Sequence, residues 1–262
     1  MLTTDLVPGA PCWISLVAED HATAARFYEA VLGWNPSPAE PGQTEPGLFR
    51  LGDVIVAEME RPRGAADRPA WRIHFAVADL DAALRAVEDS GGSVLGEARQ
   101  TGGSFHTAWV GDPQGAGFGL REPEGAPVLG AVGLPGTLMW TELYTSDAAG
   151  AKDFYAALFG WTFSDVSLPG GGGAYAIVTP AGDDPERAQG GVMQLDPRHL
   201  EETGPYWQPV FHVSDCDASV ARVAGNGGGV YMGPEDAPGV GRLAVCHDSA
   251  GASFVLLTPK EG

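Results

Sequence analysis

Positive charge is scarce in this chain. Its 262 residues include 15 Lys and Arg against 34 Asp and Glu, which gives a formal net charge of −19. A surface this acidic repels phosphate backbones and anionic lipid headgroups, so we expect neither nucleic acid nor a membrane as a partner. Long apolar runs are also lacking, since no stretch reaches the roughly 18 residues that span a bilayer. The first residues carry neither the basic nor the apolar region of a signal peptide, so a cytoplasmic location is expected.

Cysteine is equally rare. Cys12, Cys216 and Cys246 lie far apart and fit neither a disulfide framework nor a CxxC metal clip. They are expected to be small buried side chains in a reducing compartment. Glycine and proline are abundant by contrast, with 38 and 21 residues, and these many turn residues argue against an all-helical bundle.

The chain repeats itself. The segment WISLVAEDHATAARFYEAVLGW at 13–34 returns as WTELYTSDAAGAKDFYAALFGW at 140–161, and WRIHFAVADLDA at 71–82 returns as WQPVFHVSDCDA at 207–218. The offset of the second pair also aligns the turn at 112–115 with the turn at 248–251. We therefore predict a first domain at 1–124, a Gly- and Pro-rich linker at 125–135 and a second domain at 136–262.

Each half divides again into two similar parts. In the first half, Asp20 and Asp79 each follow a strand-like segment and precede an amphipathic helical pattern, which is the arrangement of an N-cap. Short strand-like segments separated by Gly, Pro and Asp follow each helix. The sequence thus predicts an α+β protein with four βαβββ modules, two in each half.

These motifs resemble the glyoxalase/bleomycin resistance/extradiol dioxygenase superfamily, also called the vicinal oxygen chelate family. The resemblance rests on a strand ending in Asp, then FY followed by a Gly-Trp pair, then V-x-D-x-D-A, Gly-Gly and the D-x-x-G turn, each present twice. It covers nearly the whole chain. It implies that each half is an open curved sheet, a half-barrel of two modules, around a cavity for a small organic molecule. Metal-using members of the family hold a divalent ion in that cavity.

The positions that carry metal ligands in such members can be counted out in this sequence. They are occupied by Trp13, Arg72 and Gly119 in the first half and by Trp140, Gln208 and Val255 in the second. Apart from Gln208, none of these side chains is a ligand for a divalent metal. Glu58 or Glu60 would add one carboxylate at most. We therefore expect no metal site and no cofactor.

Strand alternation predicts which side chains face the two cavities. Ligand contacts are expected from Trp13, Ser15, Arg72, Trp140, Tyr144 and Gln208, and acid–base chemistry from His74, Glu142 and His212. For each there is a structural alternative. The two Trp residues either stack on a ligand or plug the cavity, and Arg72 either binds an anionic ligand or forms an internal ion pair. The His and Glu side chains either transfer protons or bond to neighbouring strands.

Two classes of function follow. In the first, the protein binds a small aromatic or polyketide-like molecule without metal, for sequestration and resistance or within secondary metabolism. In the second, it is a cofactor-independent enzyme of secondary metabolism, such as a cyclase, an isomerase or a hydroxylase-like protein, that uses the cavity His and Glu residues. A metal-dependent glyoxalase I-type lyase or dioxygenase is an outside alternative. The sequence does not name the ligand, and it leaves both a monomer and a homodimer open.

Overall fold

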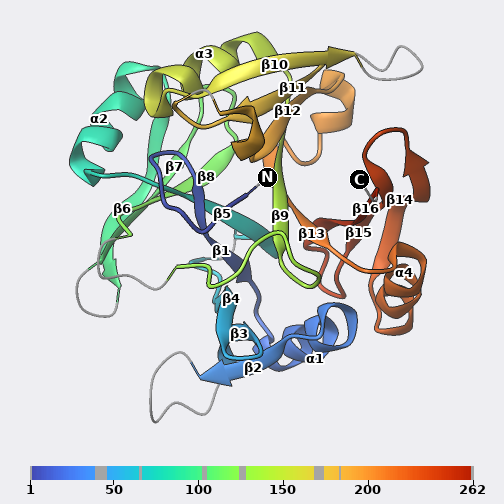
Figure 1. Ribbon diagram of the computed structural model, residues 1–262. Coiled ribbons are helices and arrows are strands. Elements are labelled where there is room, and N and C mark those ends of the chain that lie inside the picture. The colour runs from blue at the N-terminus through green and yellow to red at the C-terminus, as the bar shows by residue number, and fades with distance from the viewer. Residues whose placement is uncertain are drawn as a thin grey trace. The chain divides into compact units, whose positions relative to one another are not determined.

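The computed structural model describes residues 2–38, 46–64, 67–101, 105–123, 128–167, 174–182 and 184–260. Four times in succession, a strand is followed by a helix and then by three strands (Figure 1). The first half contains β1 (Pro11–Val17), α1 (His21–Leu32), β2 (Asn35–Pro38), β3 (Pro46–Leu51), β4 (Val54–Glu60), β5 (Ala70–Ala76), α2 (Leu80–Asp89), β6 (Ser93–Thr101), β7 (Phe105–Gly111) and β8 (Gly117–Arg121). The second half contains β9 (Leu138–Thr145), α3 (Ala148–Phe159), β10 (Thr162–Ser167), β11 (Ala174–Thr179), β12 (Gly190–Gln194), β13 (Tyr206–His212), α4 (Cys216–Gly225), β14 (Gly229–Ala237), β15 (Gly241–His247) and β16 (Ser253–Pro259), with short 3-10 turns at Pro185–Arg187 and Pro197–Leu200.

The four helices begin in the same way. The carboxylate of Asp20 accepts a hydrogen bond from the Thr23 N–H at 3.0 Å, and that of Asp79 from the Ala82 N–H at 2.8 Å. Asp147 and Asp215 cap α3 and α4 by the same contact three residues ahead. Each cap satisfies a backbone N–H that the first turn of a helix leaves without a partner. The predicted cap residues Asp20 and Asp79 are thereby confirmed.

Each half of the chain forms its own open sheet. The strand order is β2-β3-β4-β1-β5-β8-β7-β6 in the first half and β10-β11-β12-β9-β13-β16-β15-β14 in the second. In both, the first strand of a module pairs in parallel with the last strand of the same module, and the remaining neighbours within the module are antiparallel. The predicted α+β class with two tandem open sheets is confirmed. The exact domain boundaries at 124 and 136 stay a prediction.

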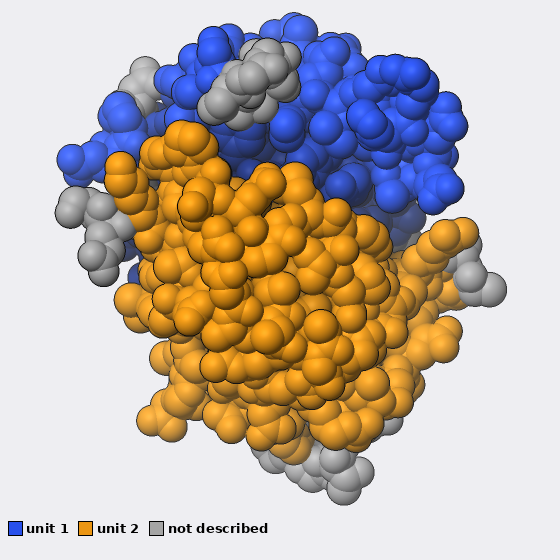
Figure 2. Space-filling view, turned by 90° about the vertical axis from the view of Figure 1, so that its right-hand side faces the viewer, with its two compact units in different colours: residues 1–12, 73–128, 140–208 blue, residues 13–72, 129–139, 209–262 orange. Residues whose placement is uncertain are grey.

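The chain also divides into two compact units, and each unit combines modules from both halves. Unit 1 comprises residues 1–12, 73–128 and 140–208, and unit 2 comprises residues 13–72, 129–139 and 209–262 (Figure 2). Accordingly α2 contacts α3 within unit 1, and α1 contacts α4 within unit 2.

Aromatic side chains fill the core of each unit, and six of the seven in each unit are equivalent through the repeat. In unit 2 the rings in mutual contact are those of Phe27, Tyr28, Trp34, Phe49, Trp71, Phe211 and Phe254. In unit 1 they are those of Phe75, Phe118, Phe154, Tyr155, Phe159, Trp161 and Trp207. Large rings dominate core energetics because each buries 150–250 Å².

A buried hydrogen-bonded chain links these rings to the repeated D-x-x-G turn. In unit 1 the Trp207 indole donates to the Tyr155 hydroxyl at 2.9 Å, and this hydroxyl donates to Asp112 at 3.2 Å. In unit 2 Trp71 donates to Tyr28 at 2.9 Å, and Tyr28 donates to Asp248 at 3.1 Å. The other oxygen of each Asp accepts two backbone N–H groups of its own turn. The Trp, Tyr and Asp of these two chains therefore have a structural role, and no ligand is needed to account for their repetition in the sequence.

Across the part of the chain that the structure describes, no helix has the length and apolarity needed to cross a membrane.

Candidate functional site

The first strand of each module presents its two faces as the alternation predicts. On β1, the apolar face consists of Ile14 and Leu16, which are fully buried. On β13, Trp207 and Phe211 point into the aromatic cores described above, so Tyr206, Gln208 and His212 lie on the opposite face of the strand. Strand alternation places the predicted site residues of β1 and β13 on these second faces, and their contact with a ligand stays a prediction.

In unit 1, Glu142 lies at the centre of a hydrogen-bonded cluster. One of its carboxylate oxygens accepts the Tyr144 hydroxyl at 2.6 Å, and the other accepts the Tyr175 hydroxyl at 3.1 Å. The Trp140 indole N–H in turn donates to the Tyr175 hydroxyl at 2.7 Å. The ring of Tyr206 lies 5.1 Å from that of Tyr144. We call these five residues the Glu142 cluster. All of them are half-buried, so the cluster keeps part of its surface exposed.

The surroundings of Glu142 shift its acidity. Burial raises the pKa of its carboxyl group above the usual value, and the hydrogen bonds from Tyr144 and Tyr175 oppose this rise. Burial together with the nearby carboxylate raises the pKa of both tyrosines, so their hydroxyls stay protonated and act as donors. The arrangement can accept further hydrogen bonds at Glu142, or exchange a proton there.

Backbone geometry leaves room for Tyr175. Gly191 of β12 pairs with Glu142 of β9 in the parallel register, and a Cβ on Gly191 would lie 2.0 Å from the Tyr175 ring. Any larger residue would displace the ring. Gly191 thus sets the position of the hydroxyl that contacts Glu142.

The equivalent residues of the first half, in unit 2, are arranged differently. The Trp13 indole donates directly to Glu58 at 2.8 Å, and its side chain is 1% exposed. The Arg72 guanidinium donates to both oxygens of Asp67 at 2.7 and 2.8 Å and to Glu60 at 3.0 Å. The structure therefore shows the internal ion pair that the sequence left open for Arg72, with Asp67 as a partner that sequence reasoning missed.

The remaining predicted residues are His74, His212, Ser15 and Gln208. His74 is buried, and its ring lies over Gly119, where a Cβ would approach it to 2.0 Å. The His212 ring contacts the Gly133 carbonyl oxygen at 2.9 Å. Ser15 and Gln208 are both buried. The contacts of His212 are those of a histidine bonded to neighbouring backbone.

Two family models match the chain, one in each half. A model described as "Glyoxalase-like domain" matches residues 13–121, and one described as "Glyoxalase/Bleomycin resistance protein/Dioxygenase superfamily" matches residues 137–256. The chain belongs to this superfamily. The resemblance inferred from the repeated motifs is confirmed.

Relatives of this superfamily align over nearly the whole chain. The protein is 34% identical over 257 residues to "Putative glyoxylase CFP32" of Mycobacterium tuberculosis, covering 96% of this chain and 95% of that protein. It is 34% identical over 280 residues to "Anthracycline biosynthesis protein DnrV" of Streptomyces peucetius, covering 99% and 96%. Among solved structures, the Mn(II)-bound glyoxalase of Novosphingobium aromaticivorans superposes with a TM-score of 0.65 at 16% identity, covering 98% of this chain and 84% of that one. This last likeness is one of fold.

The metal that such family members hold does not fit the side chains found here. In unit 2 the indole of Trp13 and the guanidinium of Arg72 point at Glu58 and Glu60, so two donor groups lie at the carboxylates. A cationic guanidinium repels a divalent ion, and an indole offers it no lone pair. Within the described ranges no three His, Cys, Asp or Glu side chains are grouped so as to hold a metal ion.

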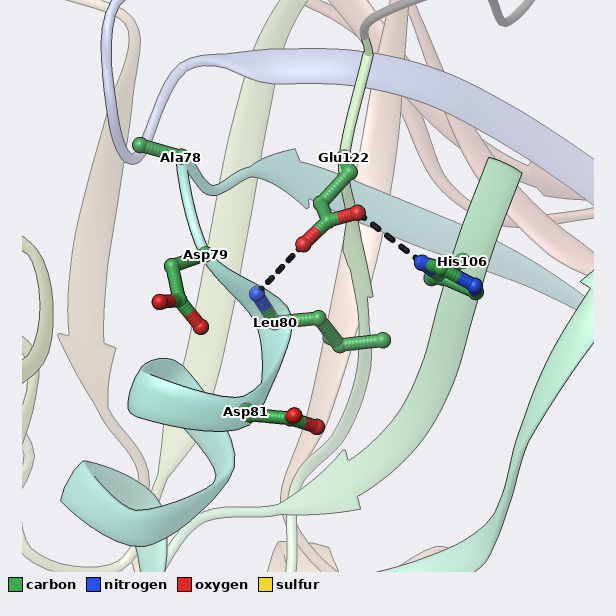
Figure 3. A pocket seen from close by; sticks show the side chains of 6 residues that line it. All are labelled: Ala78, Asp79, Leu80, Asp81, His106 and Glu122. Carbon is green, nitrogen blue, oxygen red and sulfur yellow. Dashed lines mark hydrogen bonds and ion pairs between the residues drawn. The ribbon is translucent and has the colours of Figure 1, made fainter. Parts of the chain in front are cut away.

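A separate pocket lies at the start of α2. It has a volume of about 600 Å³ and is lined by Ala78, Asp79, Leu80, Asp81, His106 and Glu122 (Figure 3). The Glu122 carboxylate accepts the Leu80 N–H at 2.8 Å and contacts the His106 ring at 3.1 Å. Glu122 thus extends the capping of α2. None of the predicted site residues lines this pocket.

Sequence reasoning missed two members of the Glu142 cluster. Tyr206 lies two residues before Gln208 on β13, so the alternation that selected Gln208 extends to it. Tyr175 lies on β11, for which the repeats supplied no register, and only its contact with Gly191 reveals its place.

Proposed function

We propose that the protein binds a small aromatic, polyketide-like molecule without metal, at the Glu142 cluster. The observation that carries this proposal is the cluster itself: two half-buried tyrosines donate to one carboxylate, and a tryptophan and a third tyrosine contact those two. Flat aromatic rings next to a few polar groups are typical of small-molecule sites, because the rings supply contact area and the polar groups fix orientation. The biological role would be sequestration and resistance, or a step in secondary metabolism.

The relatives support this ligand class. Two of them, DnrV of Streptomyces peucetius and DauV of Streptomyces sp. strain C5, are named as anthracycline biosynthesis proteins. Anthracyclines are planar aromatic molecules, which suit a site walled by indole and phenol rings. Fold alone does not decide among functions in this superfamily, so the proposal rests on the cluster and not on the sheet.

Titration with an anthracycline aglycone tests the proposal. Quenching of tryptophan fluorescence should report saturable binding, and dialysis against EDTA should leave the affinity unchanged. Metal analysis of the purified protein should find well under one equivalent of Zn, Ni, Fe or Mn. A stoichiometric ion that resists dialysis, or binding that EDTA abolishes, would contradict the metal-independent mode and favour a glyoxalase- or dioxygenase-type reaction.

A second candidate function is supported by the raised pKa of Glu142. A carboxyl group shifted toward neutral pH and held between two hydroxyls is suited to general acid–base catalysis on a bound molecule. The protein would then be a cofactor-independent cyclase, isomerase or hydroxylase-like enzyme. Glu142→Gln should abolish turnover of such a substrate and keep its binding within a few-fold. Unchanged turnover in this variant would leave binding as the function.

A further inference from the structure

Resting on the proposed function, we infer that only the second half binds the ligand, and that the ligand is a neutral or cationic aromatic molecule which donates a hydrogen bond to Glu142. Anionic molecules are excluded by the same site. The first-half counterpart is closed by the chain's own side chains.

The direction of the hydrogen bonds sets the polarity of the second-half site. The hydroxyls of Tyr144 and Tyr175 both donate to Glu142, and the Trp140 N–H donates to Tyr175. The donors of Trp140, Tyr144 and Tyr175 are thus directed into the network. A carboxylate has about four acceptor positions, of which this network uses two. The free capacity of Glu142 is for accepting, so a ligand that bonds to Glu142 has to bring the donor.

The negative charge of Glu142 also disfavours an anionic ligand. Glu142 is the charged residue of the cluster, whose other members are one tryptophan and three tyrosines. A ligand carboxylate, sulfonate or phosphate would meet a like charge in a partly desolvated place, which is unfavourable. An ammonium group would be attracted both by the carboxylate and by the faces of nearby rings. The net charge of −19 adds to this preference at long range.

Among the described residues of the first half, the equivalent side chains are engaged with one another. Arg72 makes three hydrogen bonds to Asp67 and Glu60, and its side chain is 7% exposed. An aromatic ligand would have to displace this buried guanidinium and leave two half-buried carboxylates without their cation, which is unfavourable. Trp13 is not accessible to a ligand either, because its indole N–H donates to Glu58 and its ring is buried.

In each half, the first module pairs its first strand with its last strand, β1 with β4 and β9 with β12. The carboxylate lies on the last strand, β4, in the first half and on the first strand, β9, in the second half. In the first half, Ser15 of β1 pairs with Glu58 of β4. In the second half, Glu142 of β9 pairs with Gly191 of β12. The small residue and the acid have exchanged strands. With the acid on β9, the paired position on β12 is Gly191, and the Tyr175 ring lies over it. The direct Trp–Glu hydrogen bond of the first half is therefore replaced in the second half by a carboxylate that accepts from two tyrosines.

Three probes with one ring system test the inference. They are 2-aminoanthraquinone, which is a neutral donor, anthraquinone, which has no donor, and anthraquinone-2-sulfonate, which is an anion. The wild-type protein should bind the amino compound about tenfold more tightly than anthraquinone, because a hydrogen bond to a charged acceptor contributes at least that factor. The sulfonate should bind most weakly. This ranking requires no variant.

Matched variants then locate the site. Glu142→Gln should reduce the advantage of the amino compound over anthraquinone to less than threefold, while Glu58→Gln should leave it unchanged. Thermal unfolding of each variant checks that it is folded. If the sulfonate binds as well as the amino compound, the inference is overturned and the proposed function stands. If Glu58→Gln removes the advantage and Glu142→Gln does not, the ligand binds in the first half, and both the inference and binding at the Glu142 cluster are overturned. If none of the three probes binds the wild-type protein, both are overturned.

Discussion

At the scale of single residues, the two repeated tryptophans occupy unlike surroundings. Trp13 is buried and bonded to Glu58, whereas Trp140 is half-buried and belongs to the Glu142 cluster. The sequence left two alternatives open for both residues, a packed plug and a ligand wall, and we predict that Trp13 is the plug and Trp140 the ligand wall. The same residue type at an equivalent place has a different exposure in each half.

Replacing each tryptophan by alanine should separate these roles. Trp13→Ala removes a packed indole and should lower the free energy of unfolding by about 3–5 kcal/mol. Trp140→Ala should cost clearly less stability and weaken binding of an aromatic ligand by about two- to tenfold from the lost ring contact. The midpoint of denaturant unfolding and a ligand titration measure both effects. Equal losses of stability in the two variants would contradict this division.

The two buried aspartates of the Trp–Tyr–Asp chains should make stability depend on pH. Burial raises the pKa of Asp112 and of Asp248 above the usual value near 3.9, although hydrogen bonds from backbone and tyrosine oppose the rise. Because the folded state then holds the proton more tightly than the unfolded state, their contribution to stability is full below about pH 4 and falls as pH rises through the raised pKa.

The double variant Asp112→Asn, Asp248→Asn should remove this dependence. Its free energy of unfolding, measured by urea titration from pH 4 upward, should fall less steeply with pH than that of the wild type. Asp89→Asn, at an exposed carboxylate at the end of α2, is the matched control and should keep the wild-type slope. A double variant with an unchanged slope would show that these two groups do not titrate differently on unfolding.

At the scale of elements, the helices and strand faces could be predicted and the ring contacts could not. Each helix begins at an Asp, and the apolar stripe behind it has helical period, so both signals are local. The place of Tyr175 depends on its strand register against β12, and on the glycine beneath it. The register between two strands joined by a loop cannot be derived from the order of residues alone. A shift of that register by one residue exchanges the two faces of the strand.

Gly191 provides a direct test of that register. Gly191→Ala places a methyl group against the Tyr175 ring, and such overpacking should cost about 1–3 kcal/mol of stability. It should also displace Tyr175 from Glu142 and weaken ligand binding. Gly225→Ala is the control, because a Cβ there meets nothing within 4 Å, and it should be neutral or stabilise by up to about 1 kcal/mol. Thermal unfolding compares the two, and equal effects would contradict the packing described.

At the scale of the whole molecule, the cores combine modules that the sequence repeat does not pair. The repeat divides the chain into two halves, and each half indeed forms one sheet. The helix contacts, however, join α1 to α4 and α2 to α3, so each compact unit takes modules from both halves. Hydrophobic periodicity shows that a helix has a buried face, but it does not show which other element covers that face.

Neither half should therefore fold as a stable monomer. Residues 1–124 alone would leave the apolar faces of α1 and α2 without α4 and α3, and residues 136–262 alone would have the converse defect. We expect each fragment to be unfolded or self-associated, and an equimolar mixture to form a 1:1 complex with the circular dichroism of the intact chain. Gel filtration with light scattering measures this, and a folded monomeric fragment would contradict it.

The equivalence of the two aromatic cores has a consequence for descent. Phe27, Tyr28 and Trp34 of unit 2 correspond to Phe154, Tyr155 and Trp161 of unit 1, as expected if a shorter ancestor assembled as two identical copies before its gene was duplicated and joined. In such an ancestor every mutation entered both sites at once. The exchange of acid and small residue between the Ser15–Glu58 and Glu142–Gly191 pairs breaks that identity, so on this account it arose after the duplication, when one site became free to change alone.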